Sequence, residues 1–313
     1  MEVADDTDLR AFAFFSASLH KLMPGVPFQQ HRKLYLEAKR FGRLAMDDER
    51  NTQWANTLMP QADFLTDMDQ PGIIASFHTG PYRLLCMWLA KLGLPITVVI
   101  AADVAQEQDA LNVKAESQLT KNATAIDYEY LFADDPMILR KMVRALKGGR
   151  FLVFYVDGNM GVGKNSKSRN TVTIDFLAHQ IRVRTGVAEL ARRTGAPIYP
   201  VLTYYDDACK PVFRRFDAIK PDEAGDSCRG LVTRWMEQLY GHLQNVIQRD
   251  AMQWEGWFYI HHDLVLDATA RESGLFNHYL PFMVANRYFL LHKDSFNALP
   301  IPRTVYQILK ARV

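Results

Sequence analysis

The chain has 313 residues, with a hydrophobic fraction of 48%, a charged fraction of 23% and a formal net charge of +2. This composition is ordinary for a globular protein, and the near-neutral charge argues against a dedicated nucleic-acid binder, so we expect no nucleic-acid partner. The three cysteines, at unrelated spacings, form neither a disulfide framework nor a metal-binding pattern, which predicts reduced thiols. We also expect no bound metal and no cofactor.

The N-terminus and the apolar runs bear on membrane association. The chain begins MEVADDTDLR, which is acidic and lacks the basic start and apolar centre of a secretory signal. No run of about 18 uncharged apolar residues occurs, so the sequence predicts no membrane-spanning helix. The most apolar stretch, 278–292, is interrupted by Pro281 and Arg287. We expect a cytoplasmic protein, and peripheral contact with the inner membrane stays open.

The first half of the chain passes from helices to alternating strands and helices. Two amphipathic helices are predicted at 8–21 and 28–45, the second beginning after Pro27. From residue 72 onward, short apolar runs bounded by glycine and proline predict strands. These strands are expected at 72–77, 96–101, 124–130 and 151–156, and helices at 81–93 and about 135–147.

The second half continues this alternation and then changes. Strands are predicted at 171–176, 180–184, 198–205 and 212–219, with helices at about 185–195 and 229–249. The final 45 or so residues are expected to be helical and to pack on the core. Strands that alternate with helices predict a single α/β domain with a mixed, mostly parallel sheet flanked by helices. The predicted segments are a helical N-terminal extension (1–64), the core (65–265) and a helical C-terminal extension (266–313).

The stretch FLVFYVDGNMGVGKNS, residues 151–166, raises the question of a phosphate-binding loop. Gly158, Gly163 and Lys164 have the spacing of the GxxxxGK[ST] motif. However, Asn165 stands where the motif needs a hydroxyl for magnesium, and the following KSRNTVTIDF has no helical periodicity. Without a helix N-terminus the main donors to a phosphate are missing. We therefore reject a nucleotide-binding loop.

Two polar residues that follow predicted strands indicate a different site. His78 comes directly after the strand at 72–77, and Asp157 after the strand at 151–156. Ligands of α/β sheets bind at the carboxyl ends of the strands. We therefore expect His78 and Asp157 to open onto the same edge of the sheet.

Several segments resemble one family in the correct order over about residues 65–265. They are GIIASFHTGPYRLLCMWLAKLGLPITVV, FLVFYVDGNMGVG, TVTIDFLAHQIRVRTGVAELARRTGAPIYPVLTY and QWEGWFYIHHD. The chain resembles the lysophospholipid acyltransferase superfamily, and within it the lipid A late acyltransferases, which transfer lauroyl or myristoyl chains. The resemblance implies acyl transfer from a thioester on a carrier protein or coenzyme A to an amine or hydroxyl of a small-molecule acceptor.

The resemblance also implies roles for single residues. His78 would take the proton from the attacking group, and a carboxylate five positions later would orient the imidazole. Here that position is Arg83, which has only donors and whose charge would favour neutral histidine. Three explanations compete. Another carboxylate, such as Asp157 or Asp263, orients His78; the acceptor is an amine that needs less activation; or acyl transfer has been lost and the site is reused as a binding scaffold or for another reaction on a carrier-bound substrate.

Basic residues and a glycine complete the predicted site. Lys164, Arg182 and Arg184 are expected to bind an anionic donor such as a phosphopantetheine, while Arg83 and Gly158 are expected to contact substrate. Unlike typical lipid A acyltransferases, the chain shows neither an N-terminal anchor pattern nor a strongly basic charge. We therefore expect a relative in a specialised biosynthetic pathway that acts on an acyl or aminoacyl group held by an acyl or peptidyl carrier protein.

Overall fold

The computed structural model describes residues 6–51, 64–66, 68–101, 127–158, 170–221, 228–265, 278–311 and 313. The chain divides into two compact units. One, the sheet unit, consists of Arg40–Val172 and Val183–Trp254. The other, the terminal unit, consists of Met1–Lys39, Thr173–Arg182 and Glu255–Val313.

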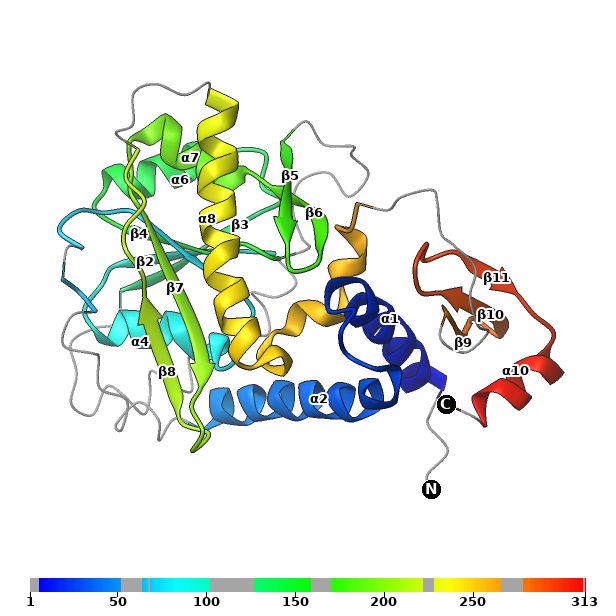
Figure 1. Cartoon of the computed structure of the whole chain (residues 1–313). Coiled ribbons are helices and arrows are strands. Elements are labelled where there is room, and N and C mark those ends of the chain that lie inside the picture. The colour runs from blue at the N-terminus through cyan, green and yellow to red at the C-terminus, as the bar shows by residue number, and fades with distance from the viewer. Residues whose placement is uncertain are drawn as a thin grey trace. The chain divides into compact units, whose positions relative to one another are not determined.

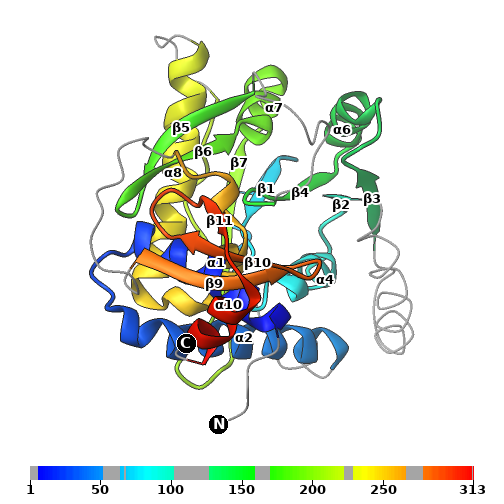
Figure 2. The same cartoon turned by 90° about the vertical axis from the view of Figure 1, so that its right-hand side faces the viewer.

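The sheet unit is built on a six-stranded sheet with the order β3-β2-β4-β1-β7-β8 (Figure 1). The strands are β1 (Ile73–Ser76), β2 (Ile96–Ile100), β3 (Tyr128–Phe132), β4 (Phe151–Tyr155), β7 (Ile198–Tyr205) and β8 (Pro211–Arg215). All neighbouring strands are parallel except β7 and β8, which are antiparallel. Figure 2 shows β7, β1, β4, β2 and β3 following one another across the sheet. The predicted α/β domain with a mixed, mostly parallel sheet is confirmed.

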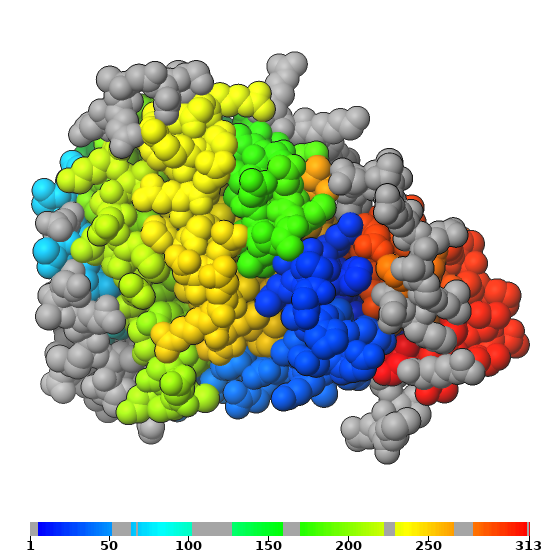
Figure 3. Space-filling model, viewed as in Figure 1, coloured from blue at the N-terminus to red at the C-terminus, as the bar shows by residue number. Residues whose placement is uncertain are grey.

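Helices cover both faces of this sheet because its strands are apolar on both sides. They are a 3₁₀ turn η1 (Tyr82–Leu84) followed by α4 (Leu85–Lys91), and α6 (Ile138–Lys147), α7 (Gly186–Thr194) and α8 (Cys228–Arg249). The buried residues of α4 pack with Ile74, Val153 and Tyr199, which lie side by side on neighbouring strands. On α8, the ring of Tyr240 packs edge-on against Phe77, with ring centroids 5.1 Å apart. The opposite side of α8 is seen in yellow on the surface in Figure 3.

The terminal unit joins the two ends of the chain. Its helices are α1 (Asp6–Leu22) and the first part of α2 (Phe28–Arg50), and three 3₁₀ turns run from 251 to 262 across the unit boundary: η2 (Ala251–Gln253), η3 (Glu255–Phe258) and η4 (Ile260–His262). The pair of strands β5 (Thr171–Phe176) and β6 (His179–Arg184) contributes residues to both units. The predicted helices at 8–21 and 28–45 are confirmed as α1 and α2.

The predicted helical C-terminal extension is wrong over residues 279–300. This segment forms a three-stranded antiparallel sheet of β9 (Tyr279–Val284), β10 (Arg287–His292) and β11 (Ala298–Pro300), and only α10 (Arg303–Lys310) is helical. Ala285 and Asn286 both have positive φ angles, 46° and 60°, which make the two-residue turn between β9 and β10. Pro281, which would break a helix, lies within β9. Figure 3 shows the orange and red C-terminal strands beside the blue α1, which packs against β9.

No helix among the described residues is long and apolar enough to cross a membrane. Residues 159–169, which include the predicted binding residue Lys164, lie outside the described residues, as does the first part of the strand predicted at 124–130.

Candidate active site

The register of two parallel strands brings His78 and Asp157 together. Ser76, the last residue of β1, pairs with Tyr155, the last residue of β4. His78 and Asp157 each follow two positions later, so they occupy equivalent places at the carboxyl edge of the sheet. Asp157 Oδ1 lies 2.8 Å from His78 Nδ1, and the backbone N–H of His78 donates to both carboxylate oxygens at 3.2 Å. The expectation that the two residues share one edge is met.

Asp157 is buried and held by a second side chain. The Asp157 side chain is only 2% exposed, whereas that of His78 is 22% exposed. The indole Nε1–H of Trp254, itself fully buried, donates to Asp157 Oδ2 at 2.8 Å. A buried carboxylate is tolerated only where donors replace its water, and here backbone, imidazole and indole donors do so. With Nδ1–H donating to Asp157, neutral His78 carries its unprotonated nitrogen at Nε2.

Trp254 reaches Asp157 because the chain around it pairs with the segment after His78. Thr79 and Trp254 form an antiparallel bridge, and the Gly80 N–H donates to the carbonyl of Gln253 at 2.8 Å. The Gln253 amide in turn accepts from Tyr205 N at 2.6 Å and donates to Tyr205 O at 2.9 Å. The segment that carries Trp254 is therefore fixed to both β1 and β7.

Gly80 is required for this pairing. Its φ is +49°, and a Cβ at this position would lie 2.6 Å from Tyr204 Cα. An L side chain is strained at such a φ, and the contact leaves no space for one. Any other residue at position 80 would push the segment after His78 away from β7.

Aromatic rings surround the imidazole of His78. The Tyr82 ring is edge-on with ring centroids 4.8 Å apart, and the Tyr155 ring is tilted at 4.9 Å. The Tyr155 hydroxyl donates to the Tyr82 carbonyl at 2.8 Å, and Cys86 Sγ lies 3.6 Å from the same hydroxyl. Burial raises the pKa of the Cys86 thiol to about 11 and raises that of Tyr155 as well. Burial thus favours the protonated thiol of Cys86 over the thiolate, which is the reactive form.

Gly158 lies directly against the imidazole. A Cβ there would be 3.2 Å from the Tyr155 carbonyl and 3.7 Å from His78 Cε1. A larger side chain would extend toward the ring edge of His78. Position 158 is thus close enough to the imidazole for a side chain there to contact it.

Arg83 contacts a different carboxylate from the one that holds His78. Its Nη1 lies 3.5 Å from Glu49 Oε2, and its guanidinium lies 5.1 Å from the centre of the Tyr82 ring. Of the carboxylates considered from the sequence, Asp157 is the one that the structure places at Nδ1. Arg83 and His78 thus both contact the Tyr82 ring, and the guanidinium does not take the place of the acid at Nδ1.

The other predicted binding residues are located only in part. Arg182 and Arg184 lie at alternate, exposed positions of β6, where their side chains share one face of the strand. The Arg182 N–H donates to the carbonyl of Asp263 at 2.7 Å. Lys164 lies outside the described residues, so the anionic-donor site stays a prediction.

Sequence reasoning did not find the roles of Trp254, Tyr155 and Glu49. Tyr155 could have been found from alternation, because it precedes Asp157 by two positions and so shares its face of the strand. Trp254 and Glu49 come from distant parts of the chain. No local pattern connects either residue to His78.

With this geometry established, comparison with known proteins identifies the family. The model of the bacterial lipid A biosynthesis acyltransferase family matches residues 45–264. A search of curated proteins finds no match. Among solved structures, the 1-acyl-sn-glycerophosphate (LPA) acyltransferase PlsC from Thermotoga maritima is similar, with 13% identity over 75% of this chain and 94% of that chain and a TM-score of 0.34. Because the family match spans more than half of the 313 residues, the chain belongs to the bacterial lipid A biosynthesis acyltransferase family.

Proposed function

We propose that this acyltransferase moves an acyl or aminoacyl group from a thioester donor to an amine or hydroxyl acceptor, with His78 as the general base. The observation that carries the proposal is the 2.8 Å contact between His78 Nδ1 and the buried Asp157 carboxylate. That contact leaves Nε2 as the basic nitrogen and supplies a negative charge to the imidazolium that forms during the reaction. The donor is a carrier protein or coenzyme A, and the pathway is a specialised biosynthetic one.

One base can carry the proton through both steps of the reaction. The acceptor attacks the thioester carbonyl while its proton passes to His78 Nε2, giving a tetrahedral oxyanion and an imidazolium that Asp157 stabilises. Collapse of the oxyanion breaks the C–S bond, and the imidazolium returns the proton to the leaving thiolate. The products are the acylated acceptor and the free thiol, so no cofactor or redox partner is needed.

The basic residues of the predicted site are proposed to bind substrate rather than to take part in proton transfer. Arg83, Lys164, Arg182 and Arg184 are proposed to contact anionic groups of the donor or acceptor. Gly158 is proposed to leave space for the reacting carbonyl beside the imidazole. We propose that this enzyme acts in the cytoplasm or at the cytoplasmic surface of the inner membrane, where acyl groups are available on carrier proteins.

The proposal is tested by intact mass spectrometry with separate donor arms. The purified protein is incubated with an acyl-loaded carrier protein, an aminoacyl-loaded carrier protein or an acyl-CoA, each with a panel of amines and alcohols. We expect loss of the acyl mass from one donor and its gain by one acceptor, and we expect His78→Ala to abolish both changes. If the protein binds a loaded carrier but no donor loses its acyl group, the alternative of a scaffold without acyl transfer is correct.

A further inference from the structure

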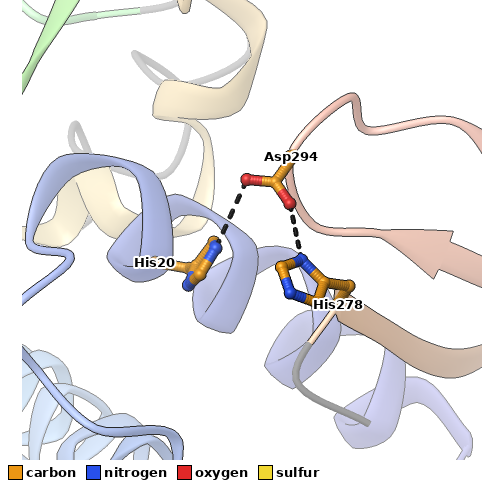
Figure 4. A group of neighbouring side chains, drawn as sticks. All are labelled: His20, His278 and Asp294. Atoms are coloured by element: carbon orange, nitrogen blue, oxygen red, sulfur yellow. Dashed lines mark hydrogen bonds and ion pairs between the residues drawn. The ribbon is translucent and has the colours of Figure 1, made fainter. Parts of the chain in front are cut away.

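Three side chains of types that can ligate metals meet in the terminal unit, drawn from both ends of the chain (Figure 4). His20 lies in the last turn of α1, His278 immediately precedes β9, and Asp294 follows β10. His20 Nε2 lies 3.3 Å from Asp294 Oδ1, and His278 Nδ1 lies 2.8 Å from Asp294 Oδ2. One ligand atom from each residue lies within 4.8 Å of the other two. Each imidazole points a ring nitrogen at a different oxygen of the same carboxylate.

We propose that His20, His278 and Asp294 bind a divalent transition metal, with Zn²⁺ as the best match. Two imidazole nitrogens and one carboxylate oxygen are a donor set that zinc accepts, at about 2.0–2.2 Å from each ligand atom. Ligand atoms on a tetrahedral zinc then lie roughly 3.3–3.5 Å apart. The contact of His20 with Oδ1, at 3.3 Å, already has this spacing, and that of His278 with Oδ2, at 2.8 Å, is shorter than it. Since the ligand atoms lie within 4.8 Å of one another, no pair needs to close by more than about 1.5 Å.

The group is partly exposed to solvent. The side chains of His20, His278 and Asp294 are 29%, 16% and 20% exposed, so water reaches the group. The buried His292 lies behind Asp294, with Nε2 3.9 Å from Oδ2 and Nδ1 2.7 Å from the hydroxyl of Ser295. Bound zinc would join α1 to the C-terminal sheet and would stabilise the terminal unit independently of acyl transfer.

A nearby cation competes with the metal for Asp294. Lys21 Nζ lies 3.7 Å from Asp294 Oδ1, on the oxygen that also faces His20. A second ammonium group, that of the buried Lys293, lies over the Phe28 ring at 3.8 Å. A divalent ion must overcome repulsion from these two charges. Removal of the charge at Lys21 should therefore tighten metal binding, an effect that no purely structural hydrogen-bond cluster predicts.

The test is calorimetric titration of the EDTA-treated 313-residue chain with ZnCl₂. We expect one ion per chain with a micromolar or lower Kd. His278→Gln and Asp294→Asn should each weaken binding by at least about 10-fold, since each removes a ligand. Lys21→Gln should tighten binding several-fold. His262→Gln, which alters an exposed histidine outside the group, is the matched control and should bind as the unaltered protein does.

A second readout guards against variants that fold poorly. Zinc at a 100-fold excess over Kd should raise the Tm of the unaltered protein by a few degrees, and each variant is compared with its own metal-free Tm. Circular dichroism establishes that each variant is folded. Absence of saturable zinc binding below about 100 µM, undiminished binding by both ligand variants, or unchanged affinity in Lys21→Gln would each overturn the proposal.

Discussion

Asp157 contacts His78 at two places, because its carboxylate accepts both the backbone N–H and the Nδ1–H of that residue. The contact arises from the parallel pairing of β1 with β4, in which Ser76 is opposite Tyr155. A motif with an acid five positions after the histidine would orient the ring from the next helical turn. Here the orienting acid comes from the adjacent strand, so a basic residue at position 83 is compatible with an oriented imidazole.

The hydrogen bond from Trp254 to Asp157 gives the first prediction. Trp254→Phe keeps most of the buried ring but removes the Nε1–H that donates to Oδ2. A hydrogen bond to a charged group contributes about 1.5–3 kcal/mol, so kcat should fall roughly tenfold or more while KM changes little. Steady-state kinetics of acyl transfer measures both parameters.

Trp88→Phe is the matched control for Trp254→Phe. Trp88 is also buried in the sheet unit, but its Nε1 has no hydrogen-bond partner among the described residues. Its replacement should leave kcat near that of the unaltered enzyme. Equal losses of kcat in both variants would mean that Trp254 acts through packing alone.

Arg83 gives the second prediction, in which KM changes and kcat does not. Arg83→Ala should raise KM about tenfold for a substrate with a carboxylate or phosphate, while kcat is largely kept, since a uniform binding interaction is lost. Arg83→Asp should not increase turnover, because Asp157 already orients the imidazole.

The ion pair of Arg83 with Glu49 supplies the control for that experiment. Glu49→Gln removes the partner charge but leaves the guanidinium in place. We expect its KM to stay within about twofold of the unaltered value. If Glu49→Gln raises KM as much as Arg83→Ala does, the arginine has a structural role and does not bind substrate.

Local patterns predicted most of the sheet unit. The runs at 72–77, 151–156 and 198–205 became β1, β4 and β7 because buried parallel strands are apolar on both faces. The same reasoning failed at 279–300, where an apolar run was interpreted as a helix. The deciding feature was the turn at Ala285–Asn286, whose positive φ angles have no strong sequence pattern when glycine is absent.

The site was predictable to the extent that it depends on strand ends. His78 and Asp157 each follow an apolar run, and the carboxyl ends of parallel strands lie at one edge of the sheet. Trp254 and Glu49 were not predictable, since they approach through tertiary pairing of distant segments. For the same reason, His20, His278 and Asp294 form a group only once both ends of the chain have folded into the terminal unit.

A buried histidine gives the third prediction, a dependence of stability on pH. His31 lies in the terminal unit and is buried. Its Nδ1 is hydrogen-bonded to Ser16 Oγ at 2.7 Å, and its Nε2 lies 3.2 Å from the Val26 carbonyl oxygen. Burial lowers its pKa from 6.5 to about 4. Between these values the unfolded chain binds a proton that the folded chain does not, so the free energy of unfolding falls as pH decreases from 6.5 toward 4.

The contribution of His31 is measured by comparing Tm against pH for the unaltered protein and for His31→Gln. The glutamine keeps a hydrogen-bonding side chain but does not titrate. We expect the variant to lose stability less steeply between pH 6.5 and 4, by on the order of 1–3 kcal/mol over the whole range. His261, whose pKa burial also lowers to about 4, should keep part of the slope. Parallel curves for the two proteins would show that His31 is not protonated on unfolding.

Whether His78 and Asp157 act as one catalytic pair is measured by a double-mutant cycle on the rate of acyl transfer. The cycle compares His78→Ala, Asp157→Asn and the double variant with the unaltered enzyme. We expect His78→Ala to reduce kcat by at least about 100-fold and the double variant to be no slower than His78→Ala alone, since groups that act as a unit are strongly non-additive. An unchanged kcat in His78→Ala would show that His78 is not the general base. A loss of kcat in the double variant equal to the product of the two single losses would show that His78 and Asp157 act independently.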